Sequence, residues 1–411
     1  MYGFWREKVL LAAQTVETLP MPARARVATG LYVNWDSAVK VDEEILGWLE
    51  GVRKAKPESL ILEREEEAAY LLDEALKKGG GEHLISERLY QRLKDLTSGR
   101  VEKRLGGNGF NMGKALLELG VRPLVSYPCR PPSIMYASPT FKVAHKGRFR
   151  LPSQAIRPGD PEYDHLAFEF SRQPELGIEA TGRIIFSWDR MSSEGWFDEE
   201  FLEFAVKAEH TDVLVLAYAH LLLPAYKKRT DLVADMLEEE ARRPKVHLEF
   251  GEGCRESMEY AFKRLTDGGC LDSVGMNERE SMKHLGARSA SLESLVNAAM
   301  EALNAYGLER ICIHTSDYVF VCSKLDEKLE AEALDSAVKA SAAQTLGGEI
   351  SRNLGKISAF QRSGYGFAVK RFERFKFILV PTYVNPSPKI LTGLGDVFTA
   401  VQAVRALYPR G

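Results

Sequence analysis

Residues 393–404, close to the end of the chain, read GLGDVFTAVQAV. Gly393 and Gly395, on either side of Leu394, allow a tight turn whose amides can approach an anion, and the apolar spacing after them predicts a helix. The positive end of the helix dipole then lies at this turn, beside Asp396. An anion site next to a carboxylate suits phosphoryl transfer to a hydroxyl, with Asp396 as the base and the amides stabilising the transferred group. The four residues also fit a glycine-rich turn with a capping aspartate.

A second glycine motif, Gly106-Gly107-Asn108-Gly109, lies far upstream. It follows a basic segment at 101–104 and opens another helical pattern over 111–119. Asn108 and the amides of the turn are suited to hold a substrate with several hydroxyls, although a turn or cap residue has the same sequence. One helix opening for a phosphate and one for a polyhydroxy compound together predict a site for two substrates.

Composition narrows the class of protein. The chain has 411 residues, of which 45% are hydrophobic, and a formal net charge of -3. This length predicts one large domain with a smaller one attached, and the charge indicates no nucleic-acid or anionic-membrane partner. No apolar stretch approaches the roughly 20 residues that cross a bilayer, and the start lacks a signal-peptide pattern. Five cysteines without a Cys-x-x-Cys pair argue against a disulfide framework and structural zinc. We expect a soluble cytoplasmic protein, either a monomer or a small homo-oligomer.

Short apolar runs alternate with helical stretches from about residue 212 onward. The runs include 213–217, 245–250 and 310–314. Continuous apolar runs separated by helices predict an α/β domain with a mostly parallel sheet that helices cover on both faces. Ligands of such a domain gather at the carboxyl ends of the strands.

Two other segments differ in character from this α/β region. Residues 41–96 are rich in helix formers and alternating charge, which predicts a helical insertion with a solvated face. Residues 135–189 hold short β-prone runs between proline and glycine turns, which predict a small sheet. We therefore predict a large nucleotide-binding domain of residues 1–36, 105–140 and 190–411, and a small α+β lid of residues 37–104 and 141–189.

Polar side chains lie at or just beyond the ends of several predicted strands. They are Asn34 and Asp36 in an early strand, His247 and Glu249 in the 245–250 run, Asn277 and Glu280 after 274–276, and His314 and Thr315 after 310–313. Because the carboxyl ends of parallel strands share one edge of a sheet, we expect these residues to gather near the glycine turns.

The whole set resembles the archaeal-type ADP-dependent sugar kinases, the glucokinase and phosphofructokinase family of the ribokinase-like superfamily. The matching motifs run in the family's order over nearly the whole chain: Asn34 to Asp36, Gly106 to Asn108, His247 to Glu249, Asn277 to Glu280, His314 with Thr315, and Gly393 to Asp396. The resemblance implies a ribokinase-like large domain with a lid. It also implies magnesium-dependent transfer of the terminal phosphoryl group of ADP to a sugar or sugar phosphate, giving AMP.

The resemblance also implies residues that hold the sugar, namely Asn34, Asp36, Gly107 and Asn108. It implies that magnesium is organised, mostly through waters, by Glu249, Glu280 and Asp396. It implies residues along the nucleotide, namely Asn277, His314 and Thr315, with an adenine wall of Val380, Pro381 and Tyr383. Magnesium keeps much of its hydration shell and takes oxygen ligands, so His247 is expected behind the site. The alternatives are a turn residue for Asp36, a solvated glutamate for Glu249 and Glu280, and ordinary core for the apolar residues.

Several basic residues indicate whether the acceptor of the phosphoryl group already carries a phosphate. Arg148, Arg150, Arg157, Arg183 and Arg190 lie in or beside the predicted small sheet, and guanidinium groups bind phosphates in bidentate fashion. They favour a sugar phosphate over free glucose, with Arg183 and Arg190 as substrate-binding residues.

Departures from the family pattern indicate a divergent paralogue. Trp35 stands between Asn34 and Asp36, and 216–220 lacks the glycine and glutamine expected near a glucose site. Ribose 1-phosphate is therefore the leading acceptor, ahead of fructose 6-phosphate and glucose. The absence of a Gly-x-x-x-x-Gly-Lys-Ser/Thr loop argues against a P-loop kinase. A non-catalytic nucleotide-binding regulatory protein is the alternative from another class.

Overall fold

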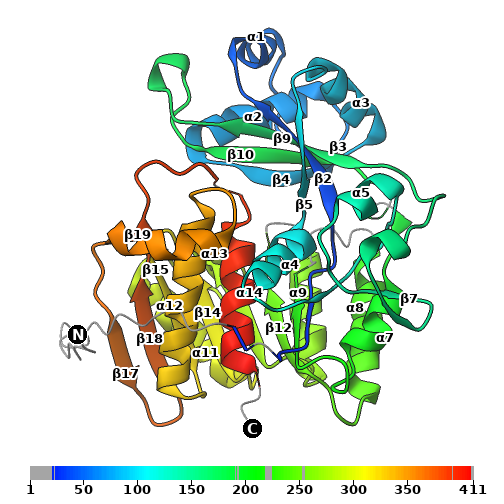
Figure 1. Cartoon of the computed structure of the whole chain (residues 1–411). Helices are drawn as coiled ribbons and strands as arrows, with labels where there is room; N and C mark the ends of the chain where they lie inside the picture. Colours follow the sequence, from blue (N-terminus) through cyan, green and yellow to red (C-terminus); the bar gives the residue numbers. More distant parts are fainter. Residues whose placement is uncertain are drawn as a thin grey trace.

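The structure, a computed structural model, describes residues 21–22, 24–189, 191, 194–217, 225–251, 255–390 and 392–408. Two layers are visible in Figure 1, a large helix-covered sheet and a smaller sheet with helices on its outer side. Arg190 and the 218–220 segment, both used in the sequence argument, lie outside the described residues.

The large sheet has nine strands in the order β17-β18-β15-β14-β13-β12-β11-β1-β6. Pairing is parallel from β6 to β14, and β15, β18 and β17 continue it as antiparallel strands. The bounds are β1 Val27–Thr29, β6 Leu124–Val125, β11 Val213–Leu216, β12 Lys245–Glu249, β13 Ser273–Asn277, β14 Arg310–His314, β15 Tyr318–Ser323, β17 Ala368–Arg371 and β18 Lys376–Pro381. The predicted mostly parallel sheet is confirmed.

Helices cover both faces of this sheet because successive side chains of a strand point to opposite sides. Val213 and Val215 of β11 pack in a core with α4 (Asn108–Glu118), α12 (Glu327–Gln344) and α14 (Leu394–Leu407). Leu214 and Leu216 pack on the other side with α8 (Tyr226–Glu239), α9 (Arg255–Asp267) and α11 (Leu292–Ala305). The continuous apolar run in β11 therefore reflects burial on both faces.

The small sheet has six strands in the order β3-β4-β10-β9-β2-β5. Their bounds are β2 Asn34–Lys40, β3 Ile61–Leu62, β4 Gly81–Ile85, β5 Glu102–Gly106, β9 Asp164–Phe170 and β10 Gly182–Ser187. A separate core joins one face of this sheet to α1 (Glu43–Gly51), α2 (Glu65–Lys78) and α3 (Glu87–Leu96). Figure 1 shows these helices on the side away from the nine-stranded sheet, so the other face is turned toward it.

The other α-helices and strands of the described residues are short. They are α5 Pro132–Ala137, α7 Glu199–Ala205, α10 Glu278–His284, α13 Ile350–Asn353, β7 Val143–His145, β8 Arg148–Arg150, β16 Gln361–Arg362 and β19 Tyr383–Val384.

Two details of the predicted small layer differ from the structure. The 41–96 segment is not wholly helical, because β3 and β4 lie within it. Gly80 permits this, since a side chain there would collide with the backbone of Arg183 on the neighbouring strand β10. In the second segment, β9 and β10 pair as expected, but β7 pairs with β8 in a separate hairpin beside α7. The exact domain boundaries stay a prediction.

The early strand also differs from the prediction. The sequence places Asn34 and Asp36 at the end of an early strand, whereas β2 begins at Asn34. The chain leaves the large sheet after β1, turns at Gly30 with φ +69°, and enters the small sheet. Any side chain at Gly30 would collide with Gly109, so the turn packs directly on the start of α4. The polar pair thus lies where the chain crosses between the layers.

Candidate active site

A pocket of about 240 Å³ lies between the two layers. Its walls come from the small sheet (Asp36, Arg104, Leu105, Arg183), from α4 (Phe110, Asn111, Lys114, Ala115) and from the C-terminal third of the chain (Gln344, Ile350, Ile390, Thr392, Val397). Residues far apart in the sequence therefore meet here, as the resemblance predicts for a site closed by a lid.

Asp396 lies beside this pocket in the first turn of α14. Gly393 caps the helix with φ +68°, in the left-handed region, and a Cβ there would collide with the side chain of Asn111. Asn111 donates from Nδ2 to Asp396 Oδ2 over 2.8 Å. Burial raises the pKa of Asp396 above its ordinary value, against the opposing effects of Asn111 and the positive charge of Arg183. The Asp396 carboxyl is thus oriented and poised to take up a proton.

Asp36 forms the opposite wall. It is buried at 7% exposure and accepts a hydrogen bond from Asn34 Nδ2 to Oδ1 over 2.7 Å. Burial raises its pKa, while the charge of Arg183 acts in the other direction. Gly106 has no side chain because a Cβ there would collide with the Asp36 carboxylate. Gly107, with φ +85°, caps α4. The predicted neighbours Asn34, Asp36 and Gly107 are therefore brought together.

Asn108 is held by the backbone on both sides. Its Oδ1 accepts from the Leu31 N–H over 3.2 Å, and its Nδ2 donates to the Ala217 carbonyl. The side chain thus ties the crossing between layers to the end of β11. Direct contact of Asn108 with a sugar stays a prediction.

A buried group next to Asp36 was not expected from the sequence. His165 on β9 is 3% exposed, and its Nε2 lies 3.2 Å from Asp189 Oδ2 and 3.3 Å from the Tyr32 hydroxyl. Burial alone would lower the pKa of His165, but the hydrogen bond and charge of Asp189 raise it. Glu82 on β4 lies 3.9 Å from His165 Nδ1. Only the register of β2 against β9, which pairs Asp36 with His165, reveals this group.

A second cluster gathers at the carboxyl ends of β12, β13 and β14. His314 Nε2 lies 2.8 Å from Glu249 Oε1. Burial would raise the pKa of Glu249, but the charge of His314 and the hydrogen bonds it receives bring it down to about 2. Burial would lower the pKa of His314, and the Glu249 carboxylate raises it. A Cβ on Gly395 would lie 3.6 Å from the His314 ring, so this cluster adjoins the turn before Asp396.

Asn277 and Glu280 form a capping box at the start of α10. Asn277 Oδ1 accepts from the Glu280 N–H over 2.9 Å, and Glu280 Oε2 accepts from the Asn277 N–H over 2.7 Å. This arrangement satisfies two helix-end donors. The motif therefore has a structural function of its own, and Glu280 is held with its carboxyl buried.

The residues that were predicted to contact the nucleotide lie in different environments. Thr315 Oγ1 donates to the Tyr318 carbonyl in the turn between β14 and β15. Val380 is fully buried in the core, which is the alternative that the sequence left open. The Arg362 guanidinium lies 4.0 Å above the Tyr383 ring and donates to the Pro381 carbonyl over 2.7 Å. Adenine contacts by these residues stay a prediction.

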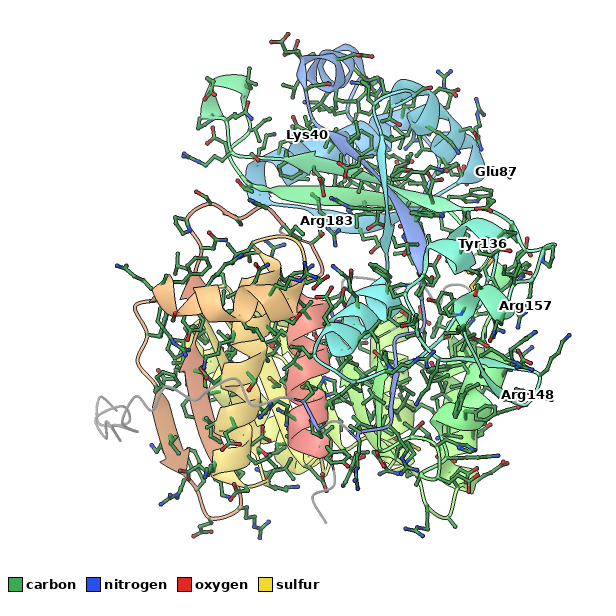
Figure 2. The ribbon with its side chains drawn as sticks, in the orientation of Figure 1. Lys40, Glu87, Tyr136, Arg148, Arg157 and Arg183 are labelled. Carbon is green, nitrogen blue, oxygen red and sulfur yellow. The ribbon has the colours of Figure 1, made fainter. Side chains whose placement is uncertain are left out.

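Three cations line the pocket, on β5, α4 and β10. Arg104 pairs with Glu169, and Lys114 Nζ lies 3.6 Å from Glu118. The side chain of Arg183 forms neither a hydrogen bond nor an ion pair with any residue that the structure describes. Figure 2 shows Arg183 between the layers, whereas Arg148 and Arg157 lie on a distant flank beside β7. Arg104 and Lys114 were missed because a basic residue on a strand or helix has the sequence of a solvated face.

Residues 25–405 match the family described as ADP-specific Phosphofructokinase/Glucokinase conserved region. The chain belongs to this family. The ADP-specific phosphofructokinase of Pyrococcus horikoshii is 24% identical over 443 residues, covering 92% of this chain and 97% of that protein. That of Pyrococcus abyssi is 24% identical over 351 residues, covering 72% and 77% respectively. The family membership expected from the motifs is confirmed.

Solved structures of two such kinases have the same fold. An ADP-dependent kinase in complex with fructose 6-phosphate and ADPβS is 16% identical, with a TM-score of 0.76 and 93% of each chain covered. A phosphofructokinase from Pyrococcus horikoshii with AMP is 19% identical, with a TM-score of 0.69 and 94% of this chain and 98% of that chain covered. The chain therefore has the fold of these two kinases, and the predicted α/β class is confirmed. None of the helices that the structure describes has the length and apolar character needed to traverse a bilayer.

Proposed function

We propose that the chain transfers the terminal phosphoryl group of ADP to a hydroxyl of a sugar phosphate, giving AMP. The observation that carries this proposal is the placing of a raised-pKa carboxyl, Asp396, beside a pocket whose wall holds Arg104, Lys114 and Arg183. A neutral sugar needs no such set of cations, whereas a phosphate forms charge-assisted hydrogen bonds with them. Family membership supports ADP as the donor.

Asp396 acts as the general base in this proposal. Its carboxylate accepts the proton of the attacking hydroxyl, and Asn111 keeps it in place through the hydrogen bond to Oδ2. The amides after Gly393 and the positive end of the α14 dipole stabilise the charge on the transferred group. Asp36, fixed by Asn34 on the opposite wall, holds a hydroxyl of the acceptor.

Magnesium fits this cluster as a mostly water-bound ion. No group of three or more His, Cys, Asp or Glu side chains among the described residues is arranged to hold a metal directly. Glu249 is ionised well below neutral pH, and Glu280 lies close enough to influence His314 electrostatically. Gly275 keeps the space in front of Glu249 clear, because a Cβ there would collide with Oε2. Glu249 and Glu280 would therefore hold the water shell of a magnesium ion that neutralises the ADP phosphates.

The proposal also names the sugar phosphate that accepts the phosphoryl group. Ribose 1-phosphate remains the first candidate because Trp35 and the 216–220 segment depart from the family pattern. Fructose 6-phosphate is the second, since the curated relatives are ADP-specific phosphofructokinases. Both offer one phosphate for the pocket cations and free hydroxyls for Asp36 and Asp396.

An AMP-release assay with ADP and a panel of acceptors tests the proposal. The panel contains ribose 1-phosphate, fructose 6-phosphate and glucose, and Asp396→Asn is the inactive control. We expect AMP formation with a sugar phosphate at a rate well above that with glucose. Nucleotide binding without AMP release for any acceptor would instead indicate the non-catalytic regulatory class.

A further inference from the structure

A buried ion pair lies close to His247, the neighbour of Glu249 on β12. Arg310 on β14 is 0% exposed and pairs with Glu330 on α12, with Nε 2.9 Å from Oε1 and Nη2 3.0 Å from Oε2. A fully buried charge pair of this kind is held rigidly, because either partner alone would be costly to bury. The pair therefore holds the Arg310 guanidinium in one position, where it can donate to neighbouring polar side chains.

Arg310 also fixes the orientation of a buried amide. Its Nη1 donates to Gln402 Oε1 on α14 and, over 3.1 Å, to Ser273 Oγ. A guanidinium has donors only, so Gln402 must present its oxygen to Arg310. The Gln402 amide nitrogen therefore points the other way and lies 3.3 Å from His247 Nε2.

His247 Nε2 faces two groups with opposite requirements. The Gln402 amide at 3.3 Å needs a lone pair on Nε2, whereas Glu249 Oε2 at 3.4 Å needs a hydrogen there. The other ring nitrogen, Nδ1, lies 2.7 Å from Ser273 Oγ, a hydroxyl that can accept from Nδ1–H or donate to a bare Nδ1. The contact with Ser273 is therefore compatible with either tautomer. The ring is 0% exposed, so it has no contact with bulk water.

We propose that Gln402 sets the tautomer of His247. The hydrogen is on Nδ1 and donates to Ser273, and Nε2 accepts from Gln402. His247 then does not donate to Glu249. Among the described residues, His314 contacts Glu249 Oε1, and Oε2 is left for a ligand. Gln402 is a positioning residue, since it acts through His247. The consequence for magnesium rests on the proposed function, whereas the tautomer itself does not.

Nitrogen NMR of protein with ¹⁵N-labelled histidine tests the proposal. The chain has eight histidines, and His247→Gln identifies the signal of interest by its loss. We expect a hydrogen-bearing Nδ1 in the wild type. Gln402→Glu keeps the size of the side chain but replaces the donor by an acceptor, so we expect the hydrogen to move to Nε2. Thr399→Val, also a buried position on α14, serves as the matched control and should leave the His247 signal unchanged.

The functional readout is the magnesium concentration that gives half-maximal activity. We expect Gln402→Glu to raise it by roughly tenfold, because the hydrogen on Nε2 then faces Glu249 Oε2 as well as the new carboxylate at position 402. A change of this size is typical of residues behind metal ligands. The Michaelis constant for the acceptor should change much less. A hydrogen on Nε2 in the wild type, or an unchanged tautomer in Gln402→Glu, would overturn the proposal. The expected tautomers in a protein without ADP-dependent kinase activity would support the proposal and refute the proposed function.

Discussion

Replacing Arg183 by glutamine should weaken the binding of a sugar phosphate while leaving the fold intact. The side chain lies in the pocket wall on β10 and makes no hydrogen bond with any described residue. Its removal therefore leaves no internal partner unsatisfied, and substitutions of this kind change stability by only about 0.5 kcal/mol. An effect on catalysis would then come from lost contacts with the substrate and from altered electrostatics.

The size of the binding effect follows from the type of contact. A hydrogen bond to a charged group contributes about 1.5–3 kcal/mol, and the lower end applies because Arg183 is partly exposed. About 1.4 kcal/mol corresponds to a tenfold change in an equilibrium constant, so the Michaelis constant for the sugar phosphate should rise roughly tenfold. The constant for an unphosphorylated sugar should stay nearly the same.

The Arg183→Gln substitution should also shift the dependence of kcat on pH. Arg183 lowers the pKa of both Asp36 and Asp396 through its positive charge, so its loss raises them further. Asp396 must be ionised to accept a proton, and activity is lost as the pH falls through its pKa. The acidic limb of the kcat profile should therefore move to higher pH in Arg183→Gln.

Steady-state kinetics at saturating ADP and magnesium measure both effects. Arg148→Gln is the matched control, since Arg148 is exposed and lies on a distant flank of the molecule (Figure 2). Equal losses with phosphorylated and unphosphorylated sugars, or equal losses in the control, would refute the assignment of Arg183 to the acceptor phosphate.

Three further substitutions have definite expected outcomes. Asp396→Asn should lower turnover by on the order of a hundredfold without preventing ADP binding, as measured by kinetics and calorimetry, because it removes the base and keeps the shape. Glu330→Gln should destabilise the fold by about 3–5 kcal/mol in urea unfolding, since Arg310 would be left as a buried unpaired charge. Thr399→Val should stabilise it by about 1 kcal/mol in the same assay, because the buried Thr399 hydroxyl has no partner among the described residues. Normal turnover of Asp396→Asn would contradict the first expectation. An unchanged free energy of unfolding in Glu330→Gln would contradict the second, and a lowered one in Thr399→Val the third.

The large sheet was predictable from the sequence because its strands are buried on both faces. In β11 all four residues of Val213–Leu216 are apolar, and burial on both sides leaves no polar alternation that would suggest another structure. The turn at Gly393 was predictable for a different reason, since a left-handed residue before a helix favours glycine. Asp396, Glu249 and His314 then follow from their positions at strand and helix ends.

The rest of the site depends on tertiary structure. Asn111 and Lys114 lie within α4, and nothing in a helical pattern distinguishes a side chain facing a pocket from one facing solvent. His165 meets Asp36 only through the pairing of β2 with β9, strands separated by more than a hundred residues. Gln402 is a polar residue inside an apolar helix, and its contacts with Arg310 and His247 explain why it is buried.

The Asn277 to Glu280 motif illustrates a different limit. The same four residues fit a metal-associated motif and a capping box, and the structure contains the capping box. Sequence cannot separate the two because both require an amide and a carboxylate three residues apart. Asn108 is a similar case, since its side chain binds two backbone groups where a sugar contact was predicted.

The fate of the terminal phosphoryl group of ADP tests the central claim most directly. Wild-type protein is mixed with magnesium, a sugar phosphate and ADP that carries a radioactive label in its terminal phosphoryl group. We predict that the label appears in a doubly phosphorylated sugar together with an equal amount of AMP, and that Asp396→Asn slows this transfer by about a hundredfold. Label that remains in ADP, or that appears only as inorganic phosphate with every acceptor of the panel, would contradict the account.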